Sequence, residues 1–150
     1  MKRGLGMNCC IYTLDCNPGK EFWNFLFSHF VKVGDEFEIR CWNDQDEEIR
    51  KALKYGKISE EDNSRLEISI KGIVSDEMLE ELIAETKPED QAIDRKFIPY
   101  FTVTAGKRFS CSHYGTEIYL DNDSVEANAT IIWALSCLEA QDAEYVYGIF

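Results

Sequence analysis

The sequence predicts an α+β domain in which helices pack on a mixed sheet of five or six strands. Two kinds of hydrophobic period point to this fold class. Several short segments alternate apolar and polar residues, as half-buried strands do, and several longer segments repeat apolar residues every three to four positions, as amphipathic helices do. In chain order they predict β-α-β-α-β-α-β-β-α. The 150 residues fit one domain, expected over residues 7–150 behind a loose N-terminal end at 1–6.

The first strand is predicted at residues 9–15, where "CCIYTLD" is rich in apolar and β-favouring residues. "NPGKEF" then predicts a helix from 18 to about 31, with Asn17 as N-cap and Pro18 at the first helical position. Gly34 is expected to stop this helix. Apolar side chains occupy most of its circumference, which indicates burial on several sides. They are Phe22, Trp23, Phe25, Leu26, Phe27 and Phe30.

The segment 36–42, "EFEIRCW", alternates charged and apolar residues and predicts a half-buried strand. A short helix is expected to follow it. Asp44 as N-cap and Glu47 three residues later form an acidic version of the capping box. Gly56 is expected to close this second helix.

The next strand is predicted over residues 65–74, where "RLEISIKGIV" alternates again. Ser75 is a favourable N-cap for a helix over 76–87. The apolar face of that helix is expected to be Met78, Leu79, Leu82 and Ile83.

Residues 96–105 and 108–121 are predicted to form two strands of a hairpin, because Gly106 suits the turn between them. Pro99 lacks a backbone N–H, which favours an edge position or the start of a strand.

The last helix is predicted from about 124 to 142, with a second acidic capping box formed by Asp123 and Glu126. The segment Tyr145–Phe150 is expected to be a final strand or a docked tail. The expected apolar face of the helix is Ile131, Ile132, Leu135 and Leu138.

The net charge of −12 excludes some classes of ligand. Nucleic acids and anionic membranes need a basic surface, so neither is expected as a direct partner. An acidic surface instead favours fast association with a basic protein. No apolar run reaches the roughly 20 residues of a membrane helix, and no secretory signal pattern is recognised, so a cytoplasmic location is expected. The six cysteines are then most simply reduced thiols.

Acidic side chains gather at three places in the sequence, beyond what helix capping requires. Capping accounts for Asp44, Glu47 and Asp123, because carboxylates at a helix start are stabilised by free N–H groups and the helix dipole. The remaining acids are expected to face a partner, with Trp42 as an aromatic anchor beside the first cluster. The predicted partner-binding surface takes in the whole clusters, with the capping acids beside the remaining ones, and consists of Trp42, Asp44, Asp46, Glu47, Glu48, Glu60, Glu61, Asp62, Asp121 and Asp123.

No metal or cofactor site is predicted. A calcium loop beginning at Asp44 would need Gly at its sixth position and Glu at its twelfth, where this sequence has Ile49 and Tyr55. The sequence also lacks CxxC pairs, HExxH, GxSxG and a glycine-rich phosphate loop. We therefore assign no catalytic residue.

Two alternative functions stay open at this point. A small enzyme or ligand-binding domain could use Cys111, His113 and Cys41, since Cys111 and His113 are two apart on a predicted strand and share a face. A structural or oligomeric adaptor could self-associate through an edge strand near Pro99 or through the apolar tail Tyr145–Phe150.

Small size, one domain, strong acidity and free cysteines together give a profile that resembles bacterial immunity proteins, the antitoxins of toxin–immunity systems. The resemblance is one of overall profile over the whole chain and includes no family motif. It implies a cytoplasmic protein that neutralises a basic toxin, such as a nuclease, by placing carboxylates in the cleft that holds phosphates.

Overall fold

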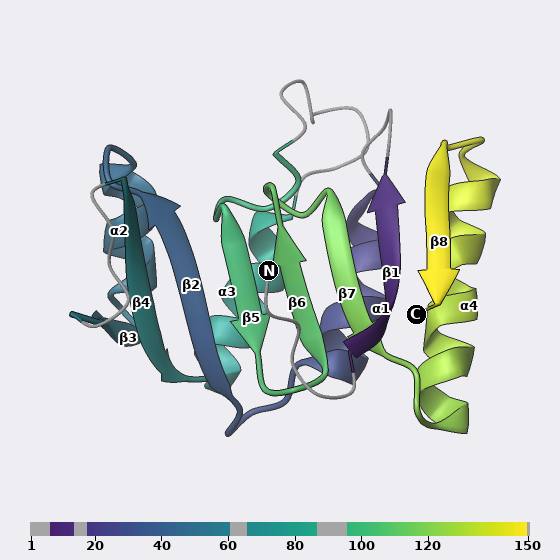
Figure 1. The fold of residues 1–150 in the computed structure, drawn as a ribbon, viewed down its shortest axis with the longest axis horizontal. Coiled ribbons are helices and arrows are strands. Elements are labelled where there is room, and N and C mark those ends of the chain that lie inside the picture. The colour runs from purple at the N-terminus through teal and green to yellow at the C-terminus, as the bar shows by residue number, and fades with distance from the viewer. Residues whose placement is uncertain (1–6, 14–17, 61–65, 87–95, 150) are drawn as a thin grey trace.

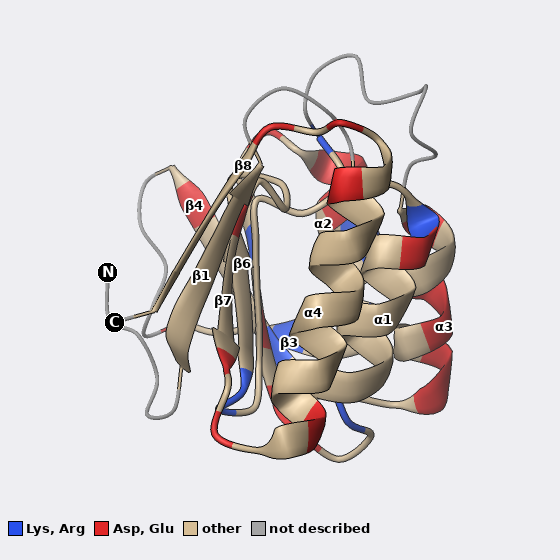
Figure 2. Ribbon diagram, turned by 90° about the vertical axis from the view of Figure 1, so that its right-hand side faces the viewer, with Lys and Arg blue, Asp and Glu red and all other residues tan. Residues whose placement is uncertain are grey.

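The computed structural model describes residues 7–13, 18–60, 66–86 and 96–149, which form an α+β fold. Within these ranges there are eight strands: β1 (Met7–Thr13), β2 (Glu36–Trp42), β3 (Gly56–Ile58), β4 (Glu67–Ile73), β5 (Thr102–Ala105), β6 (Phe109–Ser112), β7 (Glu117–Asp121) and β8 (Tyr145–Ile149). The four helices are α1 (Lys20–Phe30), α2 (Asp46–Ala52), α3 (Asp76–Glu85) and α4 (Val125–Ala140). All four helices lie on one side of the sheet (Figures 1 and 2).

The eight strands form a single sheet in the order β3-β4-β2-β5-β6-β7-β1-β8, and every pairing is antiparallel. The predicted mixed sheet of five or six strands was therefore wrong in strand number and in strand direction. β3 has only three residues and was missed, since it starts at Gly56, which was expected only to close a helix. The predicted C-terminal strand is confirmed as β8.

The predicted strand 108–121 is in fact two strands, because the chain reverses between β6 and β7. Ser112 pairs with Glu117 across this reversal. His113, Tyr114 and Gly115 have φ values of 52°, 59° and 90°, which lie in the left-handed region that no strand adopts. The predicted hairpin around Gly106 is confirmed, with Ala105 paired to Phe109.

The edge position predicted from Pro99 is wrong. β5 starts three residues later, at Thr102, and lies inside the sheet between β2 and β6. Pro99 falls in the irregular segment before the strand. This segment needs no ladder hydrogen bond from residue 99, which explains why proline is tolerated there.

The core lies between the helices and one face of the sheet. α1 buries the apolar residues predicted for it with one exception, since Phe25 is only half-buried. Ring contacts join this helix to the sheet, such as Phe27 with Phe109 at 5.3 Å between centroids. Burying aromatic and aliphatic side chains of this size contributes about 1.5–3 kcal/mol each, so this layer is the main source of stability. The predicted α3 face is confirmed, with Met78 and Leu82 buried.

The opposite face of the sheet is polar over β2, β4, β5 and β6. Arg40 lies between two carboxylates there, with Glu38 at 2.9 Å and Glu67 at 3.1 Å. Farther along the sheet a second, small apolar cluster covers the same face; it consists of Met7, Cys10 and Tyr119, with Tyr12 packed against it. The sheet therefore alternates polar and apolar residues because only one of its faces is covered by helices.

Both predicted acidic capping boxes are wrong. The residue before α2 is Gln45, and its side chain does not cap the helix but accepts the Trp42 N–H at 3.0 Å. The N-cap of α4 is Ser124, whose hydroxyl accepts the Ala127 N–H at 3.0 Å. The prediction for α3 is confirmed, because the Ser75 hydroxyl accepts the Met78 N–H.

Two other predicted helix boundaries differ from the structure. α1 begins at Lys20 rather than at Pro18, and α2 ends at Ala52, four residues before Gly56. The predicted N-cap Asn17 lies outside the described residues.

We expect Ser124→Ala to lower the free energy of unfolding by about 1 kcal/mol, since the side-chain hydrogen bond to the first turn of α4 is lost. Asp123→Ala should produce no loss of this size, because Asp123 is not the cap. Urea unfolding followed by circular dichroism measures both changes. A larger loss for Asp123→Ala than for Ser124→Ala would contradict the observed N-cap.

Candidate functional site

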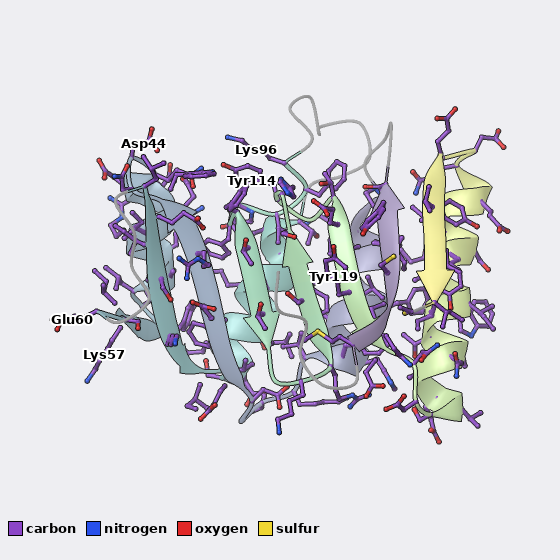
Figure 3. All side chains as sticks on the ribbon, in the orientation of Figure 1. Asp44, Lys57, Glu60, Lys96, Tyr114 and Tyr119 are labelled. Carbon is purple, nitrogen blue, oxygen red and sulfur yellow. The ribbon has the colours of Figure 1, made fainter. Side chains whose placement is uncertain are left out.

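A hollow of about 740 Å³ lies at the end of the sheet where β2 ends and the β6–β7 loop turns. Asp44, Lys96 and Tyr114 lie at this end of the molecule (Figure 3). The hollow combines the first predicted acidic cluster with aromatic residues from distant parts of the chain. Its lining residues are Trp42, Asp44, Gln45, Asp46, Glu47, Glu48, Lys96 and Tyr114.

Aromatic rings form a connected group at the hollow. The ring of Trp42 contacts Phe101 at 4.7 Å between centroids, and Phe101 contacts Tyr114 at 5.4 Å and His113 at 5.2 Å. The Lys96 ammonium lies over the Tyr114 ring, 4.7 Å from its centroid. Trp42 and Tyr114 are both half-buried, so each keeps part of its surface available for contact.

Gln45 connects the two sides of the hollow. Its amide oxygen accepts the Trp42 N–H at 3.0 Å, and its amide nitrogen donates to the Tyr114 hydroxyl at 3.0 Å. Since one side chain holds both aromatic residues, the turn after β2 and the β6–β7 loop are fixed relative to each other.

The β6–β7 loop is held in a costly backbone conformation. Two successive residues other than glycine, His113 and Tyr114, have positive φ, a conformation that costs of order 1–3 kcal/mol each. Hydrogen bonds compensate, since the Tyr114 carbonyl accepts from the Phe97 and Ile98 N–H groups at 3.0 and 3.2 Å. Strained, well-supported loops occur often at functional sites, and this loop presents Tyr114 to the hollow.

The acidic side of the hollow has a surplus of negative charge. Asp46, Glu47 and Glu48 occupy the first turn of α2, and Asp44 lies just before it. Glu47 has a long contact of 3.8 Å with Lys51, which also pairs with Glu85 at 3.2 Å. Among the described residues no cation pairs with the carboxylates of Asp44, Asp46 or Glu48. These groups are available to an external cation.

The other two predicted acidic clusters are not part of this hollow. Glu60 lies near Lys57 at the β3 edge of the sheet (Figure 3), and Glu61 and Asp62 lie outside the described residues. Asp121 ends β7 at the opposite end of that strand from Tyr114, so it belongs to the far end of the sheet. The described acids of the three clusters therefore do not form one surface.

The cluster at the far end of the sheet contains basic groups as well as acids. Asp121, Asp123 and Glu126 line a hollow together with Arg108 and His29. The pKa of the Asp123 carboxyl is raised because its protonated form can donate a hydrogen bond to Asp121 and because the negative charge of Asp121 disfavours its ionisation. This mixture of charges makes the far end a weaker candidate for a basic partner.

Sequence reasoning missed the contribution of Phe101, Tyr114 and Lys96 to the hollow. Phe101 and Tyr114 were assigned to the interior of predicted strands, which hid their exposure at a sheet end. One signal was present in the sequence, since the predicted strand 108–121 is far longer than the usual five or six residues and contains Gly115.

The predicted shared strand face of Cys111 and His113 is not observed. Cys111 is fully buried among core residues, and burial raises the pKa of its thiol to about 12. His113 is exposed in the loop after β6, where it pairs with Glu117 at 2.8 Å. Cys41 is also buried, and its pKa is likewise raised to about 12. A thiol with a raised pKa forms less thiolate, which is the opposite of what a nucleophile needs.

Within the described ranges no group of three or more His, Cys, Asp or Glu side chains could hold a metal ion. Cys9 belongs to the main core and Cys10 to the small cluster on the other face of the sheet, so the two thiols point apart. None of the described helices has the length and apolar character needed to cross a membrane.

Fold and site together define an α+β protein with a one-sided antiparallel sheet and an acidic, aromatic hollow at one sheet end. No protein-family model, curated protein or solved structure matches the chain.

Gly115→Ala should disturb the loop that presents Tyr114. A Cβ atom at position 115 would lie 2.8 Å from the ring of Trp23, in addition to the strain of a φ of 90°. We expect a loss of roughly 2–4 kcal/mol in the free energy of unfolding, measured by urea unfolding. Gly34→Ala is the matched control, since its φ is 97° and nothing lies within 4 Å. Equal losses for the two variants would contradict the Trp23 contact.

The buried thiols should resist alkylation. At pH 8 a thiol with a pKa of about 12 has roughly a thousandfold less thiolate than an ordinary cysteine, and burial slows access further. We expect iodoacetamide, with labelling mapped by mass spectrometry, to modify Cys111 at least about a hundredfold more slowly than half-buried Cys137. Fast labelling of native Cys111 would contradict this expectation and support the alternative that the protein is an enzyme with a reactive thiol.

Proposed function

We propose that this protein binds a basic partner protein at the acidic, aromatic hollow and thereby neutralises it, in the manner of an immunity protein acting on a toxin such as a nuclease. One observation supports this proposal above the others. Carboxylates without an internal cation and a fixed group of aromatic rings line the same hollow.

The chemistry of the hollow suits arginine and lysine side chains. A carboxylate can accept two hydrogen bonds from one guanidinium, and aromatic faces attract cations by about 0.5–2 kcal/mol. Lys96 over the ring of Tyr114 is an internal example of that contact. Trp42 and Tyr114 belong to the residue types that contribute most to binding energy in protein interfaces.

Neither Asp44 nor Asp123 caps a helix, and this supports an interface as the role of the acidic surface. Since Gln45 and Ser124 precede the two helices, Asp44 and Asp123 no longer have a structural role as caps. At the hollow this leaves Asp44 without a role as a cap, whereas Asp46 and Glu48 lie in the first turn of α2, where the helix dipole also favours them. A negative surface of this kind also steers a basic protein during diffusion, which raises the association rate at low salt.

The acidic surface of α3 provides a matched control, because several of its carboxylates lie away from the hollow. Lys54 pairs with Glu81 and Lys51 with Glu85, so α2 partly neutralises α3. Glu77 and Glu80 are exposed on the same helix. Reversing two charges on α3 changes the net charge of the protein as much as reversing two charges at the hollow.

The test compares tagged wild type with Asp46→Lys/Glu48→Lys and with Glu77→Lys/Glu80→Lys. Each substitution of an acid by lysine raises the net charge by two, so each double variant moves the net charge of the protein from −12 to −8. The baits are incubated with lysate of the native cell at low and at raised salt, and bound proteins are identified by mass spectrometry. We expect the wild type and the α3 variant to retain one basic protein and the hollow variant to lose it.

The captured protein is then purified, and its affinity and activity are measured with each variant. We expect the hollow variant to bind at least about tenfold more weakly and to inhibit the partner's toxic activity less. Equal weakening by the α3 variant would contradict the hollow as the binding site and leave only a general effect of charge. A partner whose activity is unchanged by the wild-type protein would contradict neutralisation.

A further inference from the structure

A second surface of the molecule has a different character, because it is mainly apolar. Glu139, near the end of α4, is a charged side chain on it and accepts a hydrogen bond from the Tyr145 hydroxyl of β8 at 2.8 Å. Half of the ten large apolar side chains that are exposed in the described part of the chain belong to α4 and β8. Figure 2 looks at this side of the molecule and shows charged positions on α4 only near its two ends. We call the flank of α4 away from α1, together with the free edge of β8, the lateral surface.

α4 is apolar or uncharged almost all round, which is unusual for a surface helix. Ala127, Ile131, Ala134 and Leu138 are buried against the core, and the only charged residues between 125 and 140 are Glu126 and Glu139. The predicted apolar face was partly wrong, since Ile132 is 63% exposed. The ring of Trp133 stacks on the ring of Phe25 in α1. Ile132 and Leu135 therefore lie on the other flank, by the rotation of about 100° per residue.

β8 is an edge strand without the usual protection. One side pairs with β1, and none of the described strands pairs with the other side. Its sequence, "YVYGI", has no charge and no proline, and Val146 and Ile149 are 48% and 64% exposed. The opposite edge strand, β3, is only three residues long and carries Lys57. Short strands with lysine discourage edge-to-edge pairing, whereas a longer uncharged edge invites it.

The distribution of charged side chains favours a second copy of this chain as the partner of the lateral surface. Two copies of a protein with a net charge of −12 repel each other over most orientations. α3 adds to this repulsion through its exposed acids, whereas the middle of α4 and all of β8 add none. Two copies can therefore approach most easily through this surface. An antiparallel edge strand is also self-complementary, since a two-fold axis places the strand antiparallel to its own copy.

We propose that the protein forms a two-fold dimer in which β8 pairs antiparallel with β8 of a second copy and α4 packs beside the second α4. The sheet then continues across the two-fold axis, and the exposed side chains Ile132 and Ile149 become buried. β8 lies at one edge of the sheet, and the hollow lies at the ends of β2 and the β6–β7 loop. The dimer leaves both hollows open, so its contacts do not overlap those of the proposed partner binding, and either proposal can fail without the other.

Sedimentation velocity over a wide concentration range tests the dimer. We expect wild type to have twice the 17.3 kDa mass of the chain at micromolar concentration. Ile132→Glu/Ile149→Glu should raise the dissociation constant at least about tenfold, because two charges enter an apolar interface on each copy. Leu66→Glu/Ile73→Glu is the matched control, since both residues are exposed and lie at the two ends of β4, away from the lateral surface.

Hydrogen exchange provides a second readout that is specific for β8. We expect the free-edge amides of β8 to exchange more slowly in the dimer than in the Ile132→Glu/Ile149→Glu variant, while circular dichroism shows the same fold for both. A monomer at every concentration would overturn the proposal, as would a higher oligomer. A dimer that tolerates the lateral double variant, or that dissociates equally in the control, would also overturn it.

Discussion

The fold depends on one constraint, that helices cover only one face of an antiparallel sheet. Each strand must then send alternate side chains to an apolar layer and to solvent. β2 satisfies this with Phe37, Ile39 and Cys41 in the core and Arg40 between two carboxylates on the open face. α1 provides most of the aromatic volume of the apolar layer. Because the sheet is one-sided, its ends and edges also stay open, and both proposed surfaces lie there.

Local features of the fold were predictable where one short segment contains the whole signal. β2 was predicted with its observed bounds, since its alternation is complete, and Ser75 marked the start of α3 through its own hydroxyl. Strand order and direction were not predictable in this way. β1 and β2 are consecutive strands, but β5, β6 and β7 lie between them in the sheet. The periodicity of a segment does not show which strand it pairs with or in which direction the two strands run. The residues themselves therefore gave no basis for predicting a mixed sheet.

The site, too, could be predicted only where its residues are neighbours in the sequence. Trp42 and the acids from Asp44 to Glu48 are neighbours in the sequence, so their shared location could be predicted. Tyr114 joins them through a hydrogen bond to Gln45 across 69 positions, and only the turn at positive φ brings it there. Tyr114 is not a residue that favours this conformation, and its hydrogen bonds to the segment 97–101 stabilise the turn. The two acidic capping boxes failed for local reasons, because Ser124 rather than its neighbour Asp123 caps α4 and no side chain caps α2.

Charge connects the two proposed surfaces. The excess of carboxylates that would attract a basic partner to the hollow also repels a second copy over most orientations, and in the described part of the chain the middle of α4 and β8 add no charge to this repulsion. A basic partner bound at each hollow reduces the negative charge of each protomer, and with it the repulsion between protomers. If both proposals hold, partner binding and dimer formation would favour each other, and by linkage the coupling would be the same in both directions. Because the surface charges are exposed, salt reduces this coupling together with the attraction of the partner. The proposed dimer contact combines apolar side chains with backbone hydrogen bonds of β8, so we expect salt to act on it mainly by screening the repulsion between the two acidic copies.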